Sequence, residues 1–386
     1  MVRNKDSMAK VRVLHLAPDE KFIDMGLASF QRVGVANELI VFSDGKVKFV
    51  KHNCKVVLPL GSFDAELLKR RMTEFDIIII HSMFTSRFCF PKSVKVVWVG
   101  FGFDYYPYIC NSRNLLLNKT LNYVLEMKSF GRIPILKSDV QWLLLNLADR
   151  ISFKFGVQKV ISKVEYFCPV LVNEFSLIKI KNFPSKVVDW NYGTLEDDFI
   201  RGFEGLDIIG DNILLGNSAS ESNNHIEAIE LIAEVKGFDV KVVAPLSYGN
   251  REYKEHICDF GKKKLSIDFI PLTDFMPIDD YIEVIQSCSV LIMNHLRQQA
   301  LGNIIIGLFL GAKVFLQKRN PIFYYLTNLG FIIYSVDDVS TESLKSRLSY
   351  DEVSLNRRLL SSIWSRKVID SKTKTLINTI IREVHS

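Results

Sequence analysis

Residues 289–315, SVLIMNHLRQQALGNIIIGLFLGAKVF, decide the fold of this chain. The segment begins with an apolar run at 290–293 that has the length of a buried strand. A polar turn follows, and residues 304–310 then have the length of a helix, with Gly311 as its C-cap. A second strand is expected at residues 313–317. This order is that of a βαβ unit, which binds ligands at the carboxyl ends of its strands, beside helix N-termini.

Strand and helix patterns extend on both sides of this unit. In the first half, strands are expected at residues 11–16, 38–42, 55–58, 76–80 and 94–99, and a helix at 64–74. In the second half, strands are expected at 213–215, 239–243 and 267–270, helices from Asn223, Arg251 and Asp279, and a helical stretch at 354–384. Alternating strands and helices indicate two doubly wound α/β domains. Residues 183–211 are the expected linker, and we place the domains at 1–190 and 191–386.

Length and composition agree with two domains. The chain has 386 residues, of which 48% are hydrophobic, enough for two ordinary cores. Apolar runs fall short of the roughly 18 residues that a spanning helix needs, and the first residues lack a signal-peptide core, so a cytosolic protein is expected. The six cysteines lack the spacing of a zinc site or a disulfide framework.

The basic residues are concentrated in one window. Residues 111–163 hold nine Lys or Arg and three acidic residues. The net charge of this window is therefore +6, which is the net charge of the whole chain. Apolar and aromatic residues lie among them, which fits peripheral attachment to an anionic membrane. The alternative is the solvated outer face of packed helices. Five residues are expected to face lipid: Lys119, Lys128, Arg132, Lys137 and Lys154. The spacing is too wide for a nucleic-acid partner.

Three polar blocks in the second half carry a family resemblance: MNHLRQQALGN at 293–303, GNSASESNNHIEA at 216–228 and APLSYGNREY at 244–253. They resemble the bacterial TDP-N-acetylfucosamine:lipid II N-acetylfucosaminyltransferase family. The first half resembles it more loosely, through HLAPDEKF at 15–22, His81 and VWVGFGFDYYPY at 97–108. The resemblance implies a GT-B architecture, with two Rossmann-like domains facing a cleft and a last helix crossing back to the first domain.

The resemblance also implies an activity. The donor would be a dTDP-sugar carrying a 4-acetamido-4,6-dideoxyhexose of the N-acetylfucosamine type. The acceptor would be a polyprenyl-diphosphate-linked saccharide on the cytoplasmic face of the inner membrane, and the product would belong to enterobacterial common antigen or a related surface polysaccharide. Two rivals stay open: a transferase of another dTDP-amino sugar in O-antigen assembly, and a scaffold that binds nucleotide sugars without turnover.

The polar loops of the second half supply the candidate donor-binding residues. Hydroxyl groups after a strand can hydrogen-bond phosphate oxygens, and Arg297 beside a helix N-terminus can stabilise the leaving nucleoside diphosphate. The alternative for the first of these loops is ordinary helix capping. The candidates are Asn217, Ser218, Ser220, Asn223, His225, Glu227, Ser247, Tyr248, Asn294, Arg297, Gln298, Gln299, Gly302 and Asn303.

Candidate bases come from the first half. Transfer to a hydroxyl needs a base near the acceptor, and Asp104 is the first choice, ahead of His15, His81 and Asp19. The alternative for Asp104 is the capping of a turn. No DxD follows an apolar strand, and Asp279 and Asp280 open a helix, so we expect no metal site and no cofactor besides the donor substrate. Arg297 completes the predicted catalytic set.

Overall fold

The computed structural model describes residues 11–53, 55–129, 157–180, 183–184, 186–235, 237 and 239–384. These residues form two compact units, each built around its own sheet. The first unit contains residues 11–109, 157–198 and 363–384, and the second contains 110–129 and 199–362. The chain therefore leaves the first unit and returns to it at its end.

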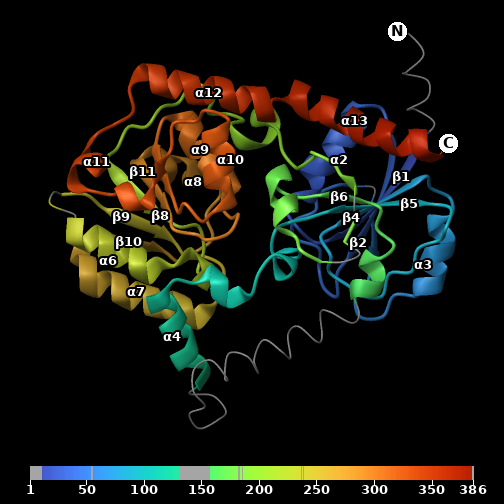
Figure 1. Cartoon of the computed structure of the whole chain (residues 1–386), viewed down its shortest axis with the longest axis horizontal. Coiled ribbons are helices and arrows are strands. Elements are labelled where there is room, and N and C mark those ends of the chain that lie inside the picture. The colour runs from blue at the N-terminus through green and yellow to red at the C-terminus, as the bar shows by residue number, and fades with distance from the viewer. Residues whose placement is uncertain are drawn as a thin grey trace. The chain divides into compact units, whose positions relative to one another are not determined.

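A parallel sheet of seven strands forms the first unit (Figure 1). Its order is β3-β2-β1-β4-β5-β6-β7. The strands are β1 (Arg12–Pro18), β2 (Ala36–Phe42), β3 (Lys55–Leu58), β4 (Ile77–His81), β5 (Lys95–Val99), β6 (Tyr166–Cys168) and β7 (Lys186–Val187). The helices are α2 (Ile23–Arg32), α3 (Ala65–Met72), α13 (Arg366–Val384) and the short turns η1 (Tyr106–Tyr108), η3 (Val172–Leu177) and η4 (Leu195–Phe199). Every residue of β4 is buried, as expected for a central parallel strand.

A parallel sheet of six strands forms the second unit, in the order β10-β9-β8-β11-β12-β13. The strands are β8 (Asn212–Leu215), β9 (Val242–Pro245), β10 (Phe269–Leu272), β11 (Cys288–Met293), β12 (Lys313–Leu316) and β13 (Tyr334–Ser335). The helices are α4 (Asn118–Ser129), α6 (His225–Val235), α7 (Arg251–Leu265), α8 (Ile278–Gln286), α9 (Leu301–Leu310), α10 (Pro321–Asn328), α11 (Thr341–Lys345) and α12 (Tyr350–Trp364). Short turns are η2 (Ser112–Leu115), η5 (Glu221–Asn223), η6 (Ser266–Asp268) and η7 (Val336–Asp338).

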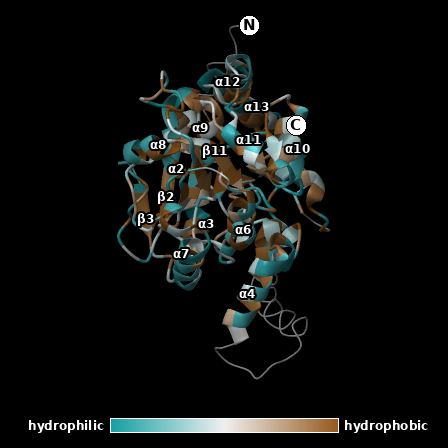
Figure 2. Cartoon of the chain, turned by 90° about the vertical axis from the view of Figure 1, so that its left-hand side faces the viewer, coloured by the Kyte–Doolittle hydropathy of each residue, from teal (hydrophilic) through white to brown (hydrophobic). Residues whose placement is uncertain are grey.

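The predicted βαβ unit is present as β11, α9 and β12, and the two sheets confirm the predicted doubly wound α/β fold. Strand β11 is buried along its whole length, and its hydrophobic colour in Figure 2 contrasts with the largely hydrophilic outer helix α7. Gly307 of α9 allows close packing on this strand, because an added Cβ would lie 2.3 Å from Leu291 Cδ2. Gly311 is the left-handed C-cap of α9, as predicted.

The predicted division at residue 190 requires correction. Residues 110–129 pack with the second unit, where Glu227 accepts hydrogen bonds from Thr120 N and Oγ1 at the start of α4 (2.9 and 2.6 Å). The expected linker at 183–211 is also only partly a linker, since Trp190 is fully buried in the core of the first unit. These contacts join residues far apart in sequence, which local patterns do not reveal.

The predicted last helix consists of two helices, α12 and α13, separated at Ser365. Helix α13 belongs to the first unit, where Leu376, Ile377 and Ile380 pack in the same core as Trp190. Trp190 Nε1 also donates to Thr373 Oγ1 at 2.8 Å. The last helix thus completes the first hydrophobic core.

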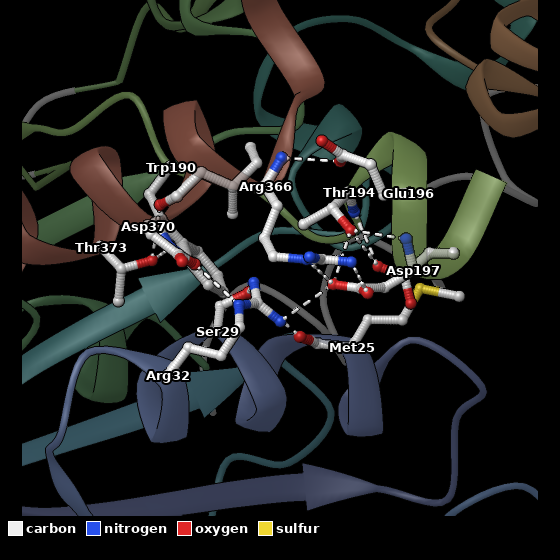
Figure 3. Close-up of polar contacts among 12 residues, drawn as sticks. Met25, Ser29, Arg32, Trp190, Thr194, Glu196, Asp197, Arg366, Asp370 and Thr373 are labelled. Atoms are coloured by element: carbon white, nitrogen blue, oxygen red, sulfur yellow. Dashed lines mark hydrogen bonds and ion pairs between the residues drawn. The ribbon is translucent and has the colours of Figure 1, made fainter. Parts of the chain in front are cut away.

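A cluster of charged residues fixes the start of α13 (Figure 3). Asp197 accepts two hydrogen bonds from Arg366, at 2.9 and 2.6 Å, and one from Arg32 of α2 at 3.3 Å. Arg32 Nε also donates to Asp370 at 2.9 Å. Bidentate arginine pairs of this kind are stronger and more directional than ordinary surface ion pairs. They join η4, α2 and α13 within the first unit.

Across the described part of the chain, no helix combines the length and apolar composition needed to cross a bilayer. Among the five basic residues expected to face lipid, Lys119 forms an ion pair with Glu230. Lys128 lies in α4, and its side chain is outside the described residues, as are Arg132, Lys137 and Lys154. Attachment through this window therefore stays a prediction.

Candidate functional site

The second sheet reverses its order of strands between β8 and β11. From β8 the chain proceeds outward to β9 and β10, and it then returns to the other side of β8 with β11. The loops that follow β8 and β11 therefore separate in opposite directions, and α/β proteins bind ligands in the crevice that this creates. Most of the predicted donor-binding residues follow these two strands.

The side chain of Asn223 connects the two loops and is completely buried. Its Oδ1 accepts hydrogen bonds from Asn217 N at 2.9 Å and from His295 Nε2 at 2.7 Å. Its Nδ2 donates to Ser218 Oγ at 3.2 Å and to Ser220 O at 3.0 Å. All the hydrogen-bonding capacity of this amide is used to hold the loops, so Asn223 positions the site from beneath.

A second amide, Gln299, extends the network. Its Oε1 accepts from Ser222 Oγ at 2.7 Å, and its Nε2 donates to Asn217 Oδ1 at 2.9 Å. Asn217 Nδ2 then donates to the hydroxyl of Tyr248, in the loop after β9, at 2.9 Å. Tyr248 is more than half exposed, so its ring is accessible at the rim of the site. Three consecutive strand ends therefore share one polar network.

Two neutral histidines lie at this network: His295 is hydrogen-bonded to Asn223, and His225 lies beside it and contacts Tyr253. Burial lowers the pKa of His225 to about 3, and burial, together with the charge of Arg297, holds the pKa of His295 well below its ordinary value. His225 Nε2 and His295 Nδ1 are buried and have no hydrogen-bond partner among the described residues. Because Asn223 accepts from His295 Nε2, the Nδ1 atom of the neutral ring is an acceptor.

His295 was absent from the residues predicted to bind the donor. Its position could have suggested it, because it lies two residues after the end of β11 and next to Asn294 in the same polar turn. Sequence reasoning favoured Arg297 instead, whose charge has an obvious phosphate partner. The pairing with Asn223 spans 72 residues and becomes visible only in the fold.

Gly216 directly follows β8, at a point where no side chain fits. Its φ is +68°, and an added Cβ would lie 2.6 Å from Asn223 Oδ1 and 2.8 Å from His225 Nε2. Both neighbouring side chains are completely buried and cannot move aside without breaking the network. The absence of a Cβ therefore keeps the buried amide and imidazole close to the strand end.

We expect Gly216→Ala to lower the free energy of unfolding by about 2 kcal/mol or more and to weaken nucleotide binding at least about tenfold. Urea denaturation and titration calorimetry with dTDP would measure the two effects. The matched control is Gly330→Ala in the same unit, where φ is +86° but an added Cβ meets nothing within 4 Å. Equal losses in the two variants would show that backbone strain alone matters and that the packing above Gly216 does not.

Arg297 and the beginning of α9 form the positively charged part of the site. Arg297 is partly exposed, donates to Gln298 O at 3.1 Å, and is close enough to His295 and Tyr248 to affect their pKa values. Helix α9 begins after Ala300, whose left-handed backbone (φ 60°) and methyl side chain provide no cap for the first amides. A helix N-terminus beside a guanidinium attracts anions.

Other predicted residues have different surroundings. Glu227 holds Thr120 of α4, as described above, so it is turned away from the network. Asn294 Nδ2 donates to Asn224 O at 2.9 Å, and Asn303 Nδ2 donates to Tyr281 OH at 2.8 Å. Three more positions complete the set: Ser247 is partly exposed after β9, Gln298 is buried, and Gly302 lies in the first turn of α9.

The first sheet has the same reversal of strand order, between β1 and β4, and the predicted His15 and His81 lie there. His15 Nδ1 is 2.8 Å from His81 Nε2, and His81 Nδ1 is 2.6 Å from Tyr192 OH. His15 Nε2 is 3.1 Å from Asn37 Oδ1. Asn37 Nδ2 donates to Val35 O, so Asn37 Oδ1 is the acceptor for His15 Nε2. It follows that His81 Nε2 donates to His15 Nδ1 and that the hydroxyl of Tyr192 donates to His81 Nδ1.

Burial keeps both of these imidazoles neutral. It lowers the pKa of His15 to about 4 and that of His81 well below its ordinary value. Neither ring is exposed to solvent. Tyr192, which donates to His81, did not emerge from the sequence. Its position 111 residues further along the chain offers no local signal.

Asp104 has a structural explanation. Its Oδ2 accepts from Met83 N at 2.9 Å and from Trp98 Nε1 at 2.8 Å, and its Oδ1 accepts from Phe101 N at 2.9 Å. These donors fasten the loops after β4 and β5, and burial raises the pKa of the carboxyl group. Asp19 is also engaged, with three backbone amides of residues 48–50. Both carboxylates therefore hold loops, which accounts for them without a catalytic role.

Among the described residues, no group of three or more His, Cys, Asp or Glu side chains is placed to hold a metal ion. The polar network at β8 and β11 is instead composed of amides, hydroxyl groups and imidazoles. Such groups, with one guanidinium, are suited to hydrogen-bonding a phosphorylated sugar or nucleotide.

Residues 207–357 match the model of a family described as 4-alpha-L-fucosyltransferase, glycosyl transferase group 56. The match covers the second sheet and the whole polar network. Similar solved structures include a glycosyltransferase from Rickettsia africae (TM-score 0.62, 11% identity, covering 96% of this chain and 99% of that one) and Anabaena HepE in complex with UDP and glucose (TM-score 0.59, 12% identity, 96% and 100%). Another is an α,α-trehalose-phosphate synthase from Burkholderia xenovorans (TM-score 0.58, 11% identity, 97% and 100%).

These likenesses show that the fold is GT-B, as the sequence predicts. With the family match over the second unit, the chain is a glycosyltransferase.

Proposed function

We propose that this glycosyltransferase moves a 4-acetamido-4,6-dideoxyhexose of the N-acetylfucosamine type from a dTDP-sugar to a polyprenyl-diphosphate-linked saccharide. The observation that carries the proposal is the polar network at β8 and β11, which lies within the region matched by the fucosyltransferase family. A 6-deoxyhexose donor is common to that family's description and to the sugar proposed. The product would enter a surface polysaccharide such as enterobacterial common antigen, at the cytoplasmic face of the inner membrane.

The second unit would hold the donor through three kinds of contact. The uncapped start of α9 and the guanidinium of Arg297 suit the diphosphate, whose negative charge grows as the sugar departs. The exposed Tyr248 offers a face for stacking at the rim. The acceptor atom Nδ1 of His295 suits a hydroxyl or amide N–H of the bound donor.

The first unit would receive the acceptor. A hydroxyl that attacks the sugar must lose its proton, and the neutral rings of His15 and His81 could take it if the hydrogen-bond chain that occupies both nitrogens of each ring opened. We therefore keep these histidines as candidates for the base and give Asp104 a positioning role. Tyr192 joins them as the hydrogen-bond donor that orients His81.

The decisive experiment is a mass-spectrometric assay of products formed from a panel of dTDP-sugars and a lipid-linked acceptor extract. The proposal expects transfer from the dTDP-4-acetamido-4,6-dideoxyhexose and little from UDP-sugars. Transfer of a different dTDP-amino sugar would favour the rival role in O-antigen assembly. Binding of the donors without any product would favour a scaffold and would overturn the proposed reaction.

We expect transfer to continue in EDTA at close to its full rate. The diphosphate would be neutralised by Arg297 and by the dipole of α9, neither of which depends on a cation. The measurement is the initial rate of product formation with 5 to about 10 mM chelator, with and without added magnesium or manganese. A rate that disappears with EDTA and returns with the metal would require another mode of holding the diphosphate.

A further inference from the structure

The loop between β2 and β3 has an unusual construction. We call residues 43–53 the lysine loop. Five successive backbone amides of this loop, from residue 48 to residue 52, donate to only two carboxylates. Asp19 accepts from Lys48 N (2.6 Å), Phe49 N (2.9 Å) and Val50 N (3.0 Å). Asp24 accepts the two remaining amides, those of residues 51 and 52, at 2.7 and 3.2 Å.

This construction fixes which side chains face the solvent. Val50 is buried in a hydrophobic cluster beside α2, so the middle of the loop is held to the first unit. Lys46, Lys48 and Lys51 are exposed, and none of them forms an ion pair with a described residue. Phe49 is 48% exposed, like several other large apolar side chains of this chain, but it lies among the three lysines. The loop thus displays three cations and one aromatic ring on a rigid support.

The acidic residues beside the loop do not neutralise the lysines through ion pairs. Asp19 and Asp24 are occupied by backbone amides, and Asp44 accepts Gly61 N at 3.0 Å. Burial alone would raise the pKa of Asp19, but the three amides, together with the nearby charge of Lys48, outweigh it, so the pKa is lowered and the carboxylate stays charged. The lysine ammonium groups remain available for an external anion.

The position of the loop suggests which anion. Strand order places the carboxyl ends of β2, β1, β4 and β5 along one edge of the first sheet. The lysine loop follows β2, and Phe103, which is 56% exposed, follows β5. Three strand spacings of roughly 4.8 Å separate these loops, about 14 Å in total, and the carboxyl ends of β1 and β4 lie between them. The edge where we place the acceptor therefore has exposed aromatic rings on both sides.

We propose that the lysine loop docks the first unit on an anionic lipid bilayer, with Phe49 in the headgroup region and the three lysines against lipid phosphates. This rests in part on the proposed function, because a polyprenyl-linked acceptor stays in the bilayer. Exposed phenylalanine beside lysine is typical of interfacial attachment, whereas a nucleic acid or an acidic protein would need the charges but not the apolar ring. The surface is separate from the basic window at 111–163.

The test uses the full chain and vesicles of phosphatidylcholine with or without 30% phosphatidylglycerol, roughly the charge of an anionic leaflet. We expect the wild type to sediment with the anionic vesicles at physiological salt. Reversal of Lys46, Lys48 and Lys51 to Glu should lower the partition coefficient at least about a hundredfold, and Phe49→Ser about tenfold. The matched control for the triple variant is the reversal of three other exposed lysines, Lys263, Lys367 and Lys374, to Glu. The matched control for Phe49→Ser is Phe275→Ser, because the ring of Phe275 is 84% exposed and lies outside the loop.

Two outcomes would overturn the proposal: a wild type that ignores anionic vesicles, or a triple variant that sediments as well as the lysine control does. An equal loss in both triple variants is a case of the second outcome, because it would show a general effect of net charge. Transfer to a short-chain, water-soluble acceptor should be unchanged in the loop variants. Vesicle binding needs neither donor nor acceptor. The docking proposal can therefore be correct when the proposed reaction is wrong, and the proposed reaction can be correct when the docking proposal is wrong.

Discussion

Arg297→Ala should reduce kcat/KM for sugar transfer by about ten- to a hundredfold and leave the fold intact. A charge-assisted hydrogen bond to phosphate contributes about 1.5 to 3 kcal/mol, and the alanine variant loses it where charge develops on the leaving diphosphate. Arg297 is partly exposed and lies outside the strands and helices, so its removal leaves no large cavity. Arg297→Lys should recover part of the rate, because it keeps the charge but loses the planar fork.

The measurement combines steady-state kinetics with thermal unfolding of the same preparations. Arg358→Ala is the matched control, because Arg358 is an exposed arginine on α12 of the same unit, distant in sequence from the polar network. Normal turnover by a folded Arg297→Ala protein would remove this residue from the catalytic set. A rise in KM with kcat unchanged would instead place it in ground-state binding.

The protein should lose stability steeply as the pH falls from 6.5 toward 4. Four histidines are completely buried and have lowered pKa values: His15, His81, His225 and His295. At pH values between the folded and the unfolded pKa, the unfolded chain binds more protons than the folded chain. The free energy of unfolding therefore decreases as the pH is lowered. His15, with a folded pKa of about 4, alone accounts for about 3 kcal/mol of this loss. Well above pH 6.5, where the unfolded imidazoles are neutral too, these groups give no pH dependence.

Urea denaturation at pH 7.5, 6.0 and 5.0 would measure the slope. The described tryptophans at 98, 190 and 364 all belong to the first unit, so a Trp142→Phe background would let fluorescence report on that unit. His225→Asn is the comparison variant in the second unit. It removes one titrating ring, and its amide replaces the Nδ1 atom of His225 that faces the hydroxyl of Tyr253. A free energy of unfolding that stays constant between pH 7.5 and pH 5.0 would contradict the neutral, buried state of these rings.

The sequence predicts the parts of the fold that depend on local pattern. The apolar runs of β4 and β11 and the helix ended by Gly311 appear where they are expected. Strand β9 begins at Val242, three residues later than predicted, because its pairing with β8 starts there. Residues 267 and 268 form a turn before β10, where a strand is predicted. Such boundaries are decided by the partner strand, which local composition does not include.

The candidate site was predictable to a smaller extent. Polar residues after β8 and β11 could be assigned to one edge, because the carboxyl ends of parallel strands coincide there. The sequence does not show which of them face a ligand and which face the protein. Glu227 illustrates the difficulty, since it lies among the candidates but serves as the acceptor for Thr120, 107 residues earlier. Asp104 presents the same problem, because its role depends on Trp98 and Met83.

The return of the chain to the first unit has a consequence for synthesis on the ribosome. The strands of the first sheet emerge early, but the core around Trp190 is closed by Leu376, Ile377 and Ile380 of α13. The second sheet lies between them in sequence and can fold as soon as α12 has emerged. The first unit must therefore wait, with an apolar surface uncovered, until α13 has been made. A nascent chain stalled before Arg366 should be bound by chaperones through its first half, although that half was translated first.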